Sequence, residues 1–320
     1  MIDTQKHADS TGYPEGKRFA FTILDDTDDS TVANVRPLYD LLHELGMRTT
    51  KTVWPLDCPE GSKLFFAAQT LADEEYREFC LELQRRGFEM TWHGATMESS
   101  QRERTVRGLE AFRSTFGDYP RVHANHGQNR ENLYWGHSRY QTAPFRGLSR
   151  LMKPKREGER GFDGESEGSP YFWGDLCREH FRFVRNLTFY DINTLRADPR
   201  TPYRVESTPW VQYWFSTSDA PDVDAFRRLV TPENIERLEA EGGVCILSTH
   251  LGKGFVRDGM VDPGVERALR DLAGRSGWFA PVSDILDHLL ARRDDTRARP
   301  WFSLARLELA HAYDRIRGLK

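Results

Sequence analysis

The sequence predicts one α/β domain, namely a distorted (β/α) barrel of about seven strands. Short apolar segments alternate along the chain with segments of helical periodicity, a pattern typical of parallel strands joined by helices. Several apolar segments end in aspartate or histidine, as strands do when their carboxyl ends carry a site. No change of composition marks a boundary within the 320 residues, so we expect a single barrel rather than two domains.

The expected elements follow one another in the order strand, then helix. The first strand, residues 18–24, is apolar and is followed by an acidic run at residues 25–29. Leucine and valine at helical spacing over residues 35–45 predict the next helix, which Gly46 would end. Later strands are predicted at residues 49–54, 88–94, 121–127, 181–187, 211–215, 244–250 and 277–281. Later helices are predicted at residues 72–86, 98–116, 130–135, 232–241 and 282–290.

Three regions are expected to lie outside this regular pattern. Residues 1–17 are polar and predict a flexible leader before a barrel that spans residues 18–295. Residues 149–168 are rich in charge and glycine, so we expect a polar insertion that forms a mobile loop. Residues 296–320 predict a helical extension at the C-terminus.

Composition excludes several classes of protein. The net charge of −4 gives no reason to expect a nucleic-acid partner, and no apolar run is long enough to span a membrane. The four cysteines form no C-x-x-C pair, which argues against a zinc ribbon or a redox motif. The start of the chain lacks the apolar run of a signal peptide, so we expect a cytoplasmic protein. The sequence gives no indication of the oligomeric state.

Polar residues at the ends of the predicted strands carry the functional hypothesis. They are Asp25, Asp26, His93, His123, His126 and His250. The carboxyl ends of parallel strands gather at one edge of the fold, so we expect a shared site there. Carboxylate and imidazole bind a borderline ion such as zinc, which supports hydrolysis. Each of these residues also has a structural interpretation. A single histidine after a strand is more often structural than functional. An acidic run before a helix is stabilised by the helix dipole, and this explanation fits Asp28 and Asp29 better than Asp25 and Asp26.

The first of these motifs resembles the polysaccharide deacetylase superfamily, the NodB-homology group of carbohydrate esterases with deformed (β/α) barrels. That family opens with a strand that ends Thr-Phe-Asp-Asp-Gly. The corresponding residues here are Phe21-Thr22-Ile23-Leu24-Asp25-Asp26-Thr27. The resemblance implies that Asp25 is the general base and that Asp26 binds the metal.

The second and third motifs of the family are altered in this chain. The family's His-Ser/Thr-x-x-His motif is matched by His93, but Met97 occupies the place of the second histidine. The third motif aligns loosely with residues 122–127, which bring His123 and His126 near the site. We expect one divalent ion, with zinc the expected metal, held by Asp26, His93 and His126. Position 126 is preferred because Gly127 lets the backbone approach closely, and His123 is the reserve ligand.

The last motif of the family, Leu-x-His, is matched by Leu247-Ser248-Thr249-His250, which implies that His250 is the general acid. Asn129, Arg130, Trp135 and Trp173 are candidate substrate-binding residues, although aromatic side chains also serve core packing and residues 128–132 also suit a capped helix start. The resemblance implies a metal-dependent deacylase acting on an acylated sugar or glycan intermediate. A catalytically degenerate glycan-binding barrel and a hydrolase of a non-sugar amide are the alternatives.

Overall fold

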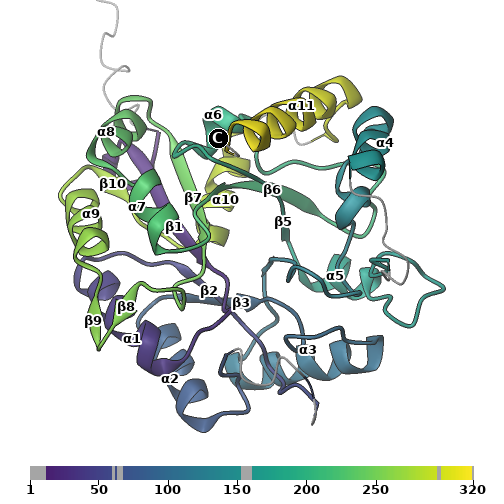
Figure 1. Ribbon diagram of the computed structural model, residues 1–320, viewed down its shortest axis with the longest axis horizontal. Helices are drawn as coiled ribbons and strands as arrows, with labels where there is room; N and C mark the ends of the chain where they lie inside the picture. Colours follow the sequence, from purple (N-terminus) through teal and green to yellow (C-terminus); the bar gives the residue numbers. More distant parts are fainter. Residues whose placement is uncertain (1–11, 60–61, 63–67, 153–160, 294–296, 319–320) are drawn as a thin grey trace, which may run out of the picture.

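The computed structural model describes residues 12–59, 62, 68–152, 161–293 and 297–318. Seven parallel strands follow one another in chain order around a closed ring, because the seventh strand pairs with both the sixth and the first (Figure 1). The strands are β1 (Phe19–Asp25), β2 (Thr50–Val53), β3 (Glu89–Trp92), β4 (Val122–His123), β5 (Phe183–Phe189), β6 (Tyr213–Asp219) and β7 (Val244–Thr249). The predicted barrel of seven strands in a single domain is therefore confirmed.

The ring is distorted at the amino ends of its strands. The short β10 (Gly277–Trp278) pairs with Phe19 and Ala20 at the start of β1, whereas β2 pairs with Leu24 and Asp25 at its end. The first half of β1 is thus separated from β2 by an additional strand. The ring closes between β1 and β2 only near the carboxyl ends, where the predicted site lies.

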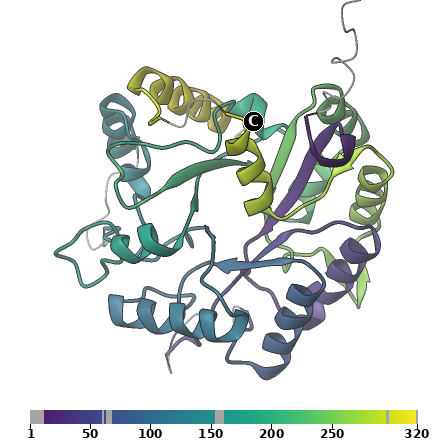
Figure 2. The ribbon, with the colours of Figure 1, turned by 180° about the vertical axis from the view of Figure 1, so that it is seen from behind.

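Helices surround the ring, as the views from both sides show (Figures 1 and 2). They are α1 (Val32–Glu44), α2 (Glu74–Arg85), α3 (Arg102–Phe116), α4 (Ala143–Met152), α5 (Gly174–His180), α6 (Thr194–Ala197), α7 (Val223–Leu229), α8 (Pro232–Ala240), α9 (Pro263–Ala273), α10 (Val282–Ala291) and α11 (Trp301–Gly318). Short 3₁₀ turns, η1 (Pro14–Gly16) and η2 (Gly136–Arg139), and a small hairpin of β8 (Val256–Arg257) and β9 (Met260–Val261) complete the described elements. None of the helices in these ranges is both long and apolar enough to cross a lipid bilayer.

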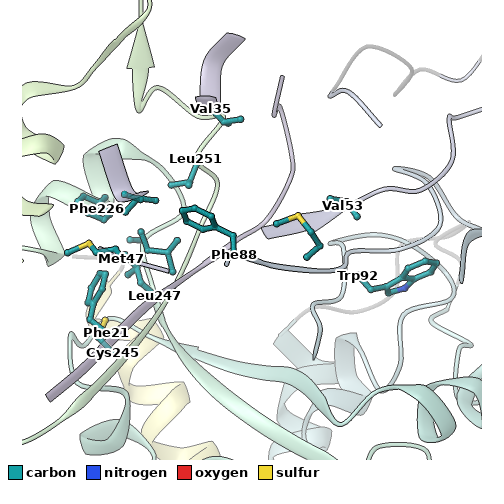
Figure 3. Packing of buried hydrophobic residues seen from close by; sticks show 14 of the residues in the cluster. Phe21, Val35, Met47, Val53, Phe88, Trp92, Phe226, Cys245, Leu247 and Leu251 are labelled. Carbon is teal, nitrogen blue, oxygen red and sulfur yellow. The ribbon is translucent and has the colours of Figure 1, made fainter. Parts of the chain in front are cut away.

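Side chains of β1 alternate between two hydrophobic clusters. Phe19, Phe21 and Ile23 face outward and pack against the surrounding helices, while Ala20 and Leu24 face the inside of the ring. The register of β1 with β7 continues this division, because outward-facing Phe21 lies opposite Cys245, and Figure 3 shows both with Leu247 in the same cluster. Both faces of β1 are buried, as expected for a parallel strand covered by helices.

Helix α10 closes the amino end of the ring. Its side chains Val282, Ile285 and Leu286 join the interior cluster. The backbone N–H of Val282 donates to Thr50 Oγ1 over 2.8 Å, and that of Ser283 donates to the Glu89 carboxylate over 3.2 Å. With the amino end filled in this way, the opening of the barrel lies at the carboxyl ends of the strands.

Two sequence-based predictions about loops differ from the structure. The helix predicted at residues 130–135 is wrong, because this stretch is a series of turns in which Asn132 Nδ2 donates to the carbonyl of His126 over 2.7 Å. The polar insertion at residues 149–168 begins inside α4 rather than in a loop, and residues 153–160 lie outside the described residues. Its remaining part is anchored, since Arg130 pairs with Asp163.

The two ends of the chain lie against the barrel. Residues 1–11 of the predicted leader lie outside the described residues, but the Tyr13 hydroxyl donates to the carbonyl of Gly242 over 2.8 Å. At the other end, α11 occupies the region of the predicted extension and packs against β5 and α4 (Figure 1). Its Glu308 carboxylate accepts hydrogen bonds from the hydroxyl and the N–H of Thr142.

Candidate functional site

The alternation of side chains along the strands decides which polar residues reach the opening of the barrel. On β1, β4 and β7 the even-numbered residues face the inside of the ring, as Ala20, Val122 and Val244 do, and on β5 the odd-numbered Phe183 does. The same alternation, continued past the strand ends, directs one set of polar side chains inward. This set consists of Asp26, His93, His126, Arg185, Ser248 and His250, and all six line one cavity of about 520 Å³.

Asp28, two residues beyond Asp26, is the centre of this cavity. Its Oδ1 lies 3.4 Å from His93 Nε2 and 3.5 Å from His126 Nε2, and its Oδ2 lies 3.3 Å from His250 Nε2. Three imidazoles from β3, β4 and β7 therefore converge on one carboxylate. Burial disfavours its ionised form, but the neighbouring imidazoles of His250, His93 and His126 outweigh burial and hold the pKa of Asp28 below its usual range.

The loop that carries Asp28 is held on several sides. The N–H of Thr27 donates to Thr52 Oγ1 over 2.9 Å, and its hydroxyl lies 2.8 Å from that of Tyr76. Asp29 has a φ of 60°. Gly252 passes so close that an added Cβ would lie 2.6 Å from the Asp29 carbonyl, so only glycine fits there. The position of Asp28 thus follows from well-packed backbone on both sides.

The residues present fit a divalent cation. Asp28, His93 and His126 each place one ligand atom within 4.8 Å of the others, and a carboxylate with two imidazoles is a set that zinc accepts. His126 Nδ1 lies 3.2 Å from Asn129 Oδ1, which can only accept, so Nε2 is left without a proton and faces Asp28. Asp28 Oδ1 is buried and has no hydrogen-bond donor within the described part of the chain.

Asp26 lies beside this cluster without belonging to it. Its Oδ2 accepts a hydrogen bond of 2.6 Å from Arg185, whose same nitrogen also contacts Ser248 Oγ. Its Oδ1 is buried, lacks a donor among the described residues and lies 3.8 Å from His93 Nδ1. Burial raises the pKa of Asp26, but Arg185, His93 and His250 together lower it further, so the side chain is ionised.

His250 presents Nε2 to the cavity because its other ring nitrogen is occupied. Nδ1 lies 2.7 Å from the carbonyl oxygen of Pro221, to which it donates a hydrogen bond. Burial disfavours the imidazolium, but the hydrogen bond to Asp28 and the charges of Asp26 and Asp28 outweigh it and raise the pKa of His250.

The structure places Asp25 away from the cavity, so the sequence-based choice of Asp25 as general base needs correction. Asp25 is odd-numbered and faces the helix layer, where its Oδ2 is 2.9 Å from Lys51 Nζ and accepts a 2.8 Å hydrogen bond from Tyr39. Its Oδ1 accepts the backbone N–H of Leu251. Both side chains of the ion pair are fully buried. Both carboxylate oxygens of Asp25 thus serve the fold.

His123, the reserve ligand, also faces outward. Its ring packs against Trp173 and Phe181, and its Nε2 lies 2.8 Å from Asn125 Oδ1. Burial lowers the pKa of His123 to about 3, so the ring is neutral. The side chain belongs to the core between β4 and α5 and does not reach the cluster around Asp28.

The four candidate substrate-binding residues divide into two pairs. Asn129 and Trp135 line the cavity. Arg130 does not, because it pairs with Asp163 and lies over the Tyr171 ring, 4.2 Å from its centroid. Trp173 is 1% exposed, and its indole N–H donates to the carbonyl of Glu131, so it is a core residue. The second pair supports the loops around the cavity.

Met97 stands in a small hydrophobic cluster with Trp54 and Cys58 instead of serving as a ligand. The ring of Trp54 lies 5.5 Å from that of His93 and 5.3 Å from that of His126. Met97 therefore contributes to the packing around the two imidazoles. His126, which follows the next strand, is the histidine that lies near His93.

Sequence reasoning missed several residues of the cavity. Asp28 was assigned to a helix start, although it lies only two residues from Asp26. Arg185 was passed over within an apolar run, where a single charged residue in a predicted strand was the available signal. Arg139 and Asp219 come from segments with no motif, so the sequence offered no signal for them.

The closed ring of seven parallel strands with a site at their carboxyl ends defines the class of fold, the NodB-like distorted (β/α) barrel. Solved structures share this fold, two of them over most of this chain. PuuE allantoinase superimposes with a TM-score of 0.51 at 13% identity over 92% of this chain and 100% of its own. A structure described as a "probable polysaccharide deacetylase" from Pseudomonas aeruginosa PAO1 gives a TM-score of 0.51 at 13% identity over 88% of this chain and 94% of its own. No protein-family model matches the chain, and no curated protein sequence does.

Proposed function

We propose that this protein is a metal-dependent deacylase that acts on an acylated sugar or glycan intermediate. The observation that carries the proposal is the convergence of His93, His126 and His250 on Asp28 beside the Asp26–Arg185 pair. The fold shared with the structure described as a "probable polysaccharide deacetylase" supports the sugar substrate.

Asp28, His93 and His126 would hold the ion, and zinc suits one carboxylate with two imidazoles. This replaces the sequence-based choice of Asp26 as ligand, since Arg185 already holds one oxygen of that carboxylate at 2.6 Å. A divalent ion at such a site polarises a carbonyl oxygen and lowers the pKa of bound water.

Two residues next to the ligands are suited to proton transfer. Asp26 is ionised, lines the cavity and has an Oδ1 with no donor among the described residues, so it is our candidate for the base that takes a proton from the attacking water. Arg185 fixes the orientation of that carboxylate through Oδ2. His250 has a raised pKa and presents Nε2 to the cavity, 3.3 Å from Asp28 Oδ2, so it is our candidate for the acid that protonates the departing amine or alcohol.

The experiment combines metal analysis with a substrate panel. Protein purified without chelator should contain one divalent ion per chain, and it should release acetate from acylated sugars. Asp26→Asn should lower turnover by about two orders of magnitude while the metal stays bound. Asp28→Asn should lose the metal. The proposal fails if Asp28→Asn retains full metal content. It also fails if the unaltered protein binds both metal and glycan without turnover, which is the behaviour expected of a catalytically degenerate binding barrel.

A hydrolase of a non-sugar amide is the second candidate. One of the matching structures is an allantoinase, an enzyme named for a substrate that is not a sugar. The substrate panel therefore includes simple and cyclic amides beside the acylated sugars. Turnover of the amides alone would favour this second candidate, and turnover of the sugars alone would exclude it.

A further inference from the structure

Arg139, in η2, lies in the wall of the cavity that holds the Asp28 cluster. Its Nε donates to Asn186 Oδ1 over 3.3 Å, its Nη2 donates to the Asn186 carbonyl, and its guanidinium carbon lies 4.4 Å from the centroid of the Trp135 ring. No acidic side chain of the described residues pairs with it, and its Nη1 has no hydrogen-bond acceptor among them. An arginine at the edge of a site is thus held in place without a partner for its charge.

The other charged groups of the cavity are matched. Asp26 pairs with Arg185 at 2.6 Å, and Asp219 pairs with Arg315 at 2.9 Å. Asp28 is surrounded by histidines, as described above. Arg139 therefore adds an unmatched positive charge to this cavity. Burial, together with the charges of Arg315 and Arg185, lowers the pKa of Arg139 to about 10 against the opposing effect of Tyr140, so the group is still charged at neutral pH.

The surroundings of Arg139 fix the plane of its guanidinium. The indole N–H of Trp135 donates to the carbonyl of Gly127 over 2.8 Å, so the ring under the guanidinium is itself anchored. Asn186 immediately follows Arg185 on β5, which places the guanidinium on the β5 side of the Asp26–Arg185 pair. A fixed planar guanidinium with a free edge is the geometry that binds carboxylate and phosphate oxygens.

We propose that Arg139 forms an anion subsite of the cavity and that the acylated substrate carries a carboxylate or a phosphate group. This inference rests on the proposed function, because it identifies the substrate class of the same site. The anionic group would lie over the β5 side of the opening while the acyl group lies at the Asp28 cluster. A neutral acylated sugar lacks the group that matches the charge of Arg139.

The first experiment measures anion binding to the full-length, metal-containing protein by calorimetry, with lactate as the carboxylate probe and inorganic phosphate as the second. Arg139→Gln should weaken binding of the preferred anion by about tenfold or more, and Arg139→Lys should weaken it less. Metal content should be unchanged in both variants. The preferred probe distinguishes a carboxylate from a phosphate substrate.

The matched control is Arg178→Gln. Arg178 lines another cavity, of about 760 Å³, with Arg204 and Arg297, and these arginines make it the alternative place for an anion to bind. Binding that survives Arg139→Gln, binding that is lost in Arg178→Gln instead, or no binding of either anion to the unaltered protein would each overturn the proposal.

The second experiment compares turnover of N-acetylglucosamine with turnover of derivatives that carry a carboxylate or a phosphate. The anionic derivative should have the higher kcat/KM, and Arg139→Gln should lower kcat/KM for the anionic derivative at least about tenfold more than kcat/KM for the neutral sugar. Anion binding at Arg139 without turnover of any acylated compound would refute the proposed function and keep the subsite. Turnover with no preference for an anion would refute the subsite and keep the function.

Discussion

Lys51→Met tests the conclusion that Asp25 is a structural residue of the core and not the general base. Lys51 and Asp25 are fully buried and 2.9 Å apart. Methionine fills a similar volume between the rings of Tyr39 and Tyr76, which now lie 5.5 and 5.7 Å from the ammonium. The Asp25 carboxylate would keep the Tyr39 hydroxyl and the Leu251 N–H but lose its counter-charge.

The expected cost follows from leaving a buried charge without its partner. Breaking such a pair from one side destabilises a protein by about 3–5 kcal/mol, and we expect a loss of this size for Lys51→Met and a similar loss for Asp25→Asn. The double variant, in which both charges are absent, should regain much of the stability. Denaturant unfolding of the four proteins gives the coupling free energy between the two positions directly.

Metal content and turnover of the double variant decide the role of Asp25. Asp25 does not line the cavity, so the double variant should keep its metal and most of its turnover. Loss of turnover by two orders of magnitude with normal stability and metal content would restore Asp25 as the base and refute the correction. A cost below about 1 kcal/mol for either single variant would contradict the argument from the ion pair.

Further predictions concern the ligands, one buried acid and one close contact. His126→Gln should lower metal affinity at least tenfold, whereas His123→Gln should leave metal content unchanged in the same titration. Burial raises the pKa of Glu131 to about 7, against its hydrogen bonds from Ser100 and Asn129, so the folded state holds this proton more tightly than the unfolded state. The free energy of unfolding should therefore fall by about 3 kcal/mol as the pH rises from 4.5 to 7. Glu131→Gln should remove this part of the pH dependence, and an unchanged pH profile in that variant would contradict the assignment to Glu131. Gly108→Val should destabilise by about 1–3 kcal/mol in denaturant, because its Cβ would lie 2.9 Å from the side chains of Ala95 and Trp92.

The order of strands and helices was predictable because each element carries its own periodicity. The strand ends that bear His93, His126 and His250 were found in this way. The sequence did not show which of Asp25 and Asp26 faces the site, although adjacent side chains on a strand point in opposite directions. Both faces of β1 are buried, so apolar residues occupy odd and even positions alike, and the sequence does not show which face looks into the ring.

The loop after β4 was mispredicted for a different physical reason. Its asparagine, arginine and glutamate residues suit a helix start in sequence. In the structure, Asn129 Nδ2 instead donates to carbonyl oxygens of Thr96 and Glu98, and Asn132 donates to that of His126. Side chains that satisfy loop carbonyls compete with helix formation. The partners of Asn129 come from a loop 31 to 33 residues earlier, which local sequence patterns do not reveal.

The pairing of β1 with β7 has a consequence for synthesis of the chain. Ala20 pairs with Val244, so β1 leaves the ribosome long before the strand that covers one of its edges. At about 5–20 residues per second, the intervening stretch takes roughly 10–45 s to make. Throughout that time an apolar strand has an unpaired edge, which is the condition under which nascent chains bind chaperones or associate with one another. The strand that presents Asp26 and leads directly to Asp28 therefore lacks the partner for one of its edges until β7 has been made.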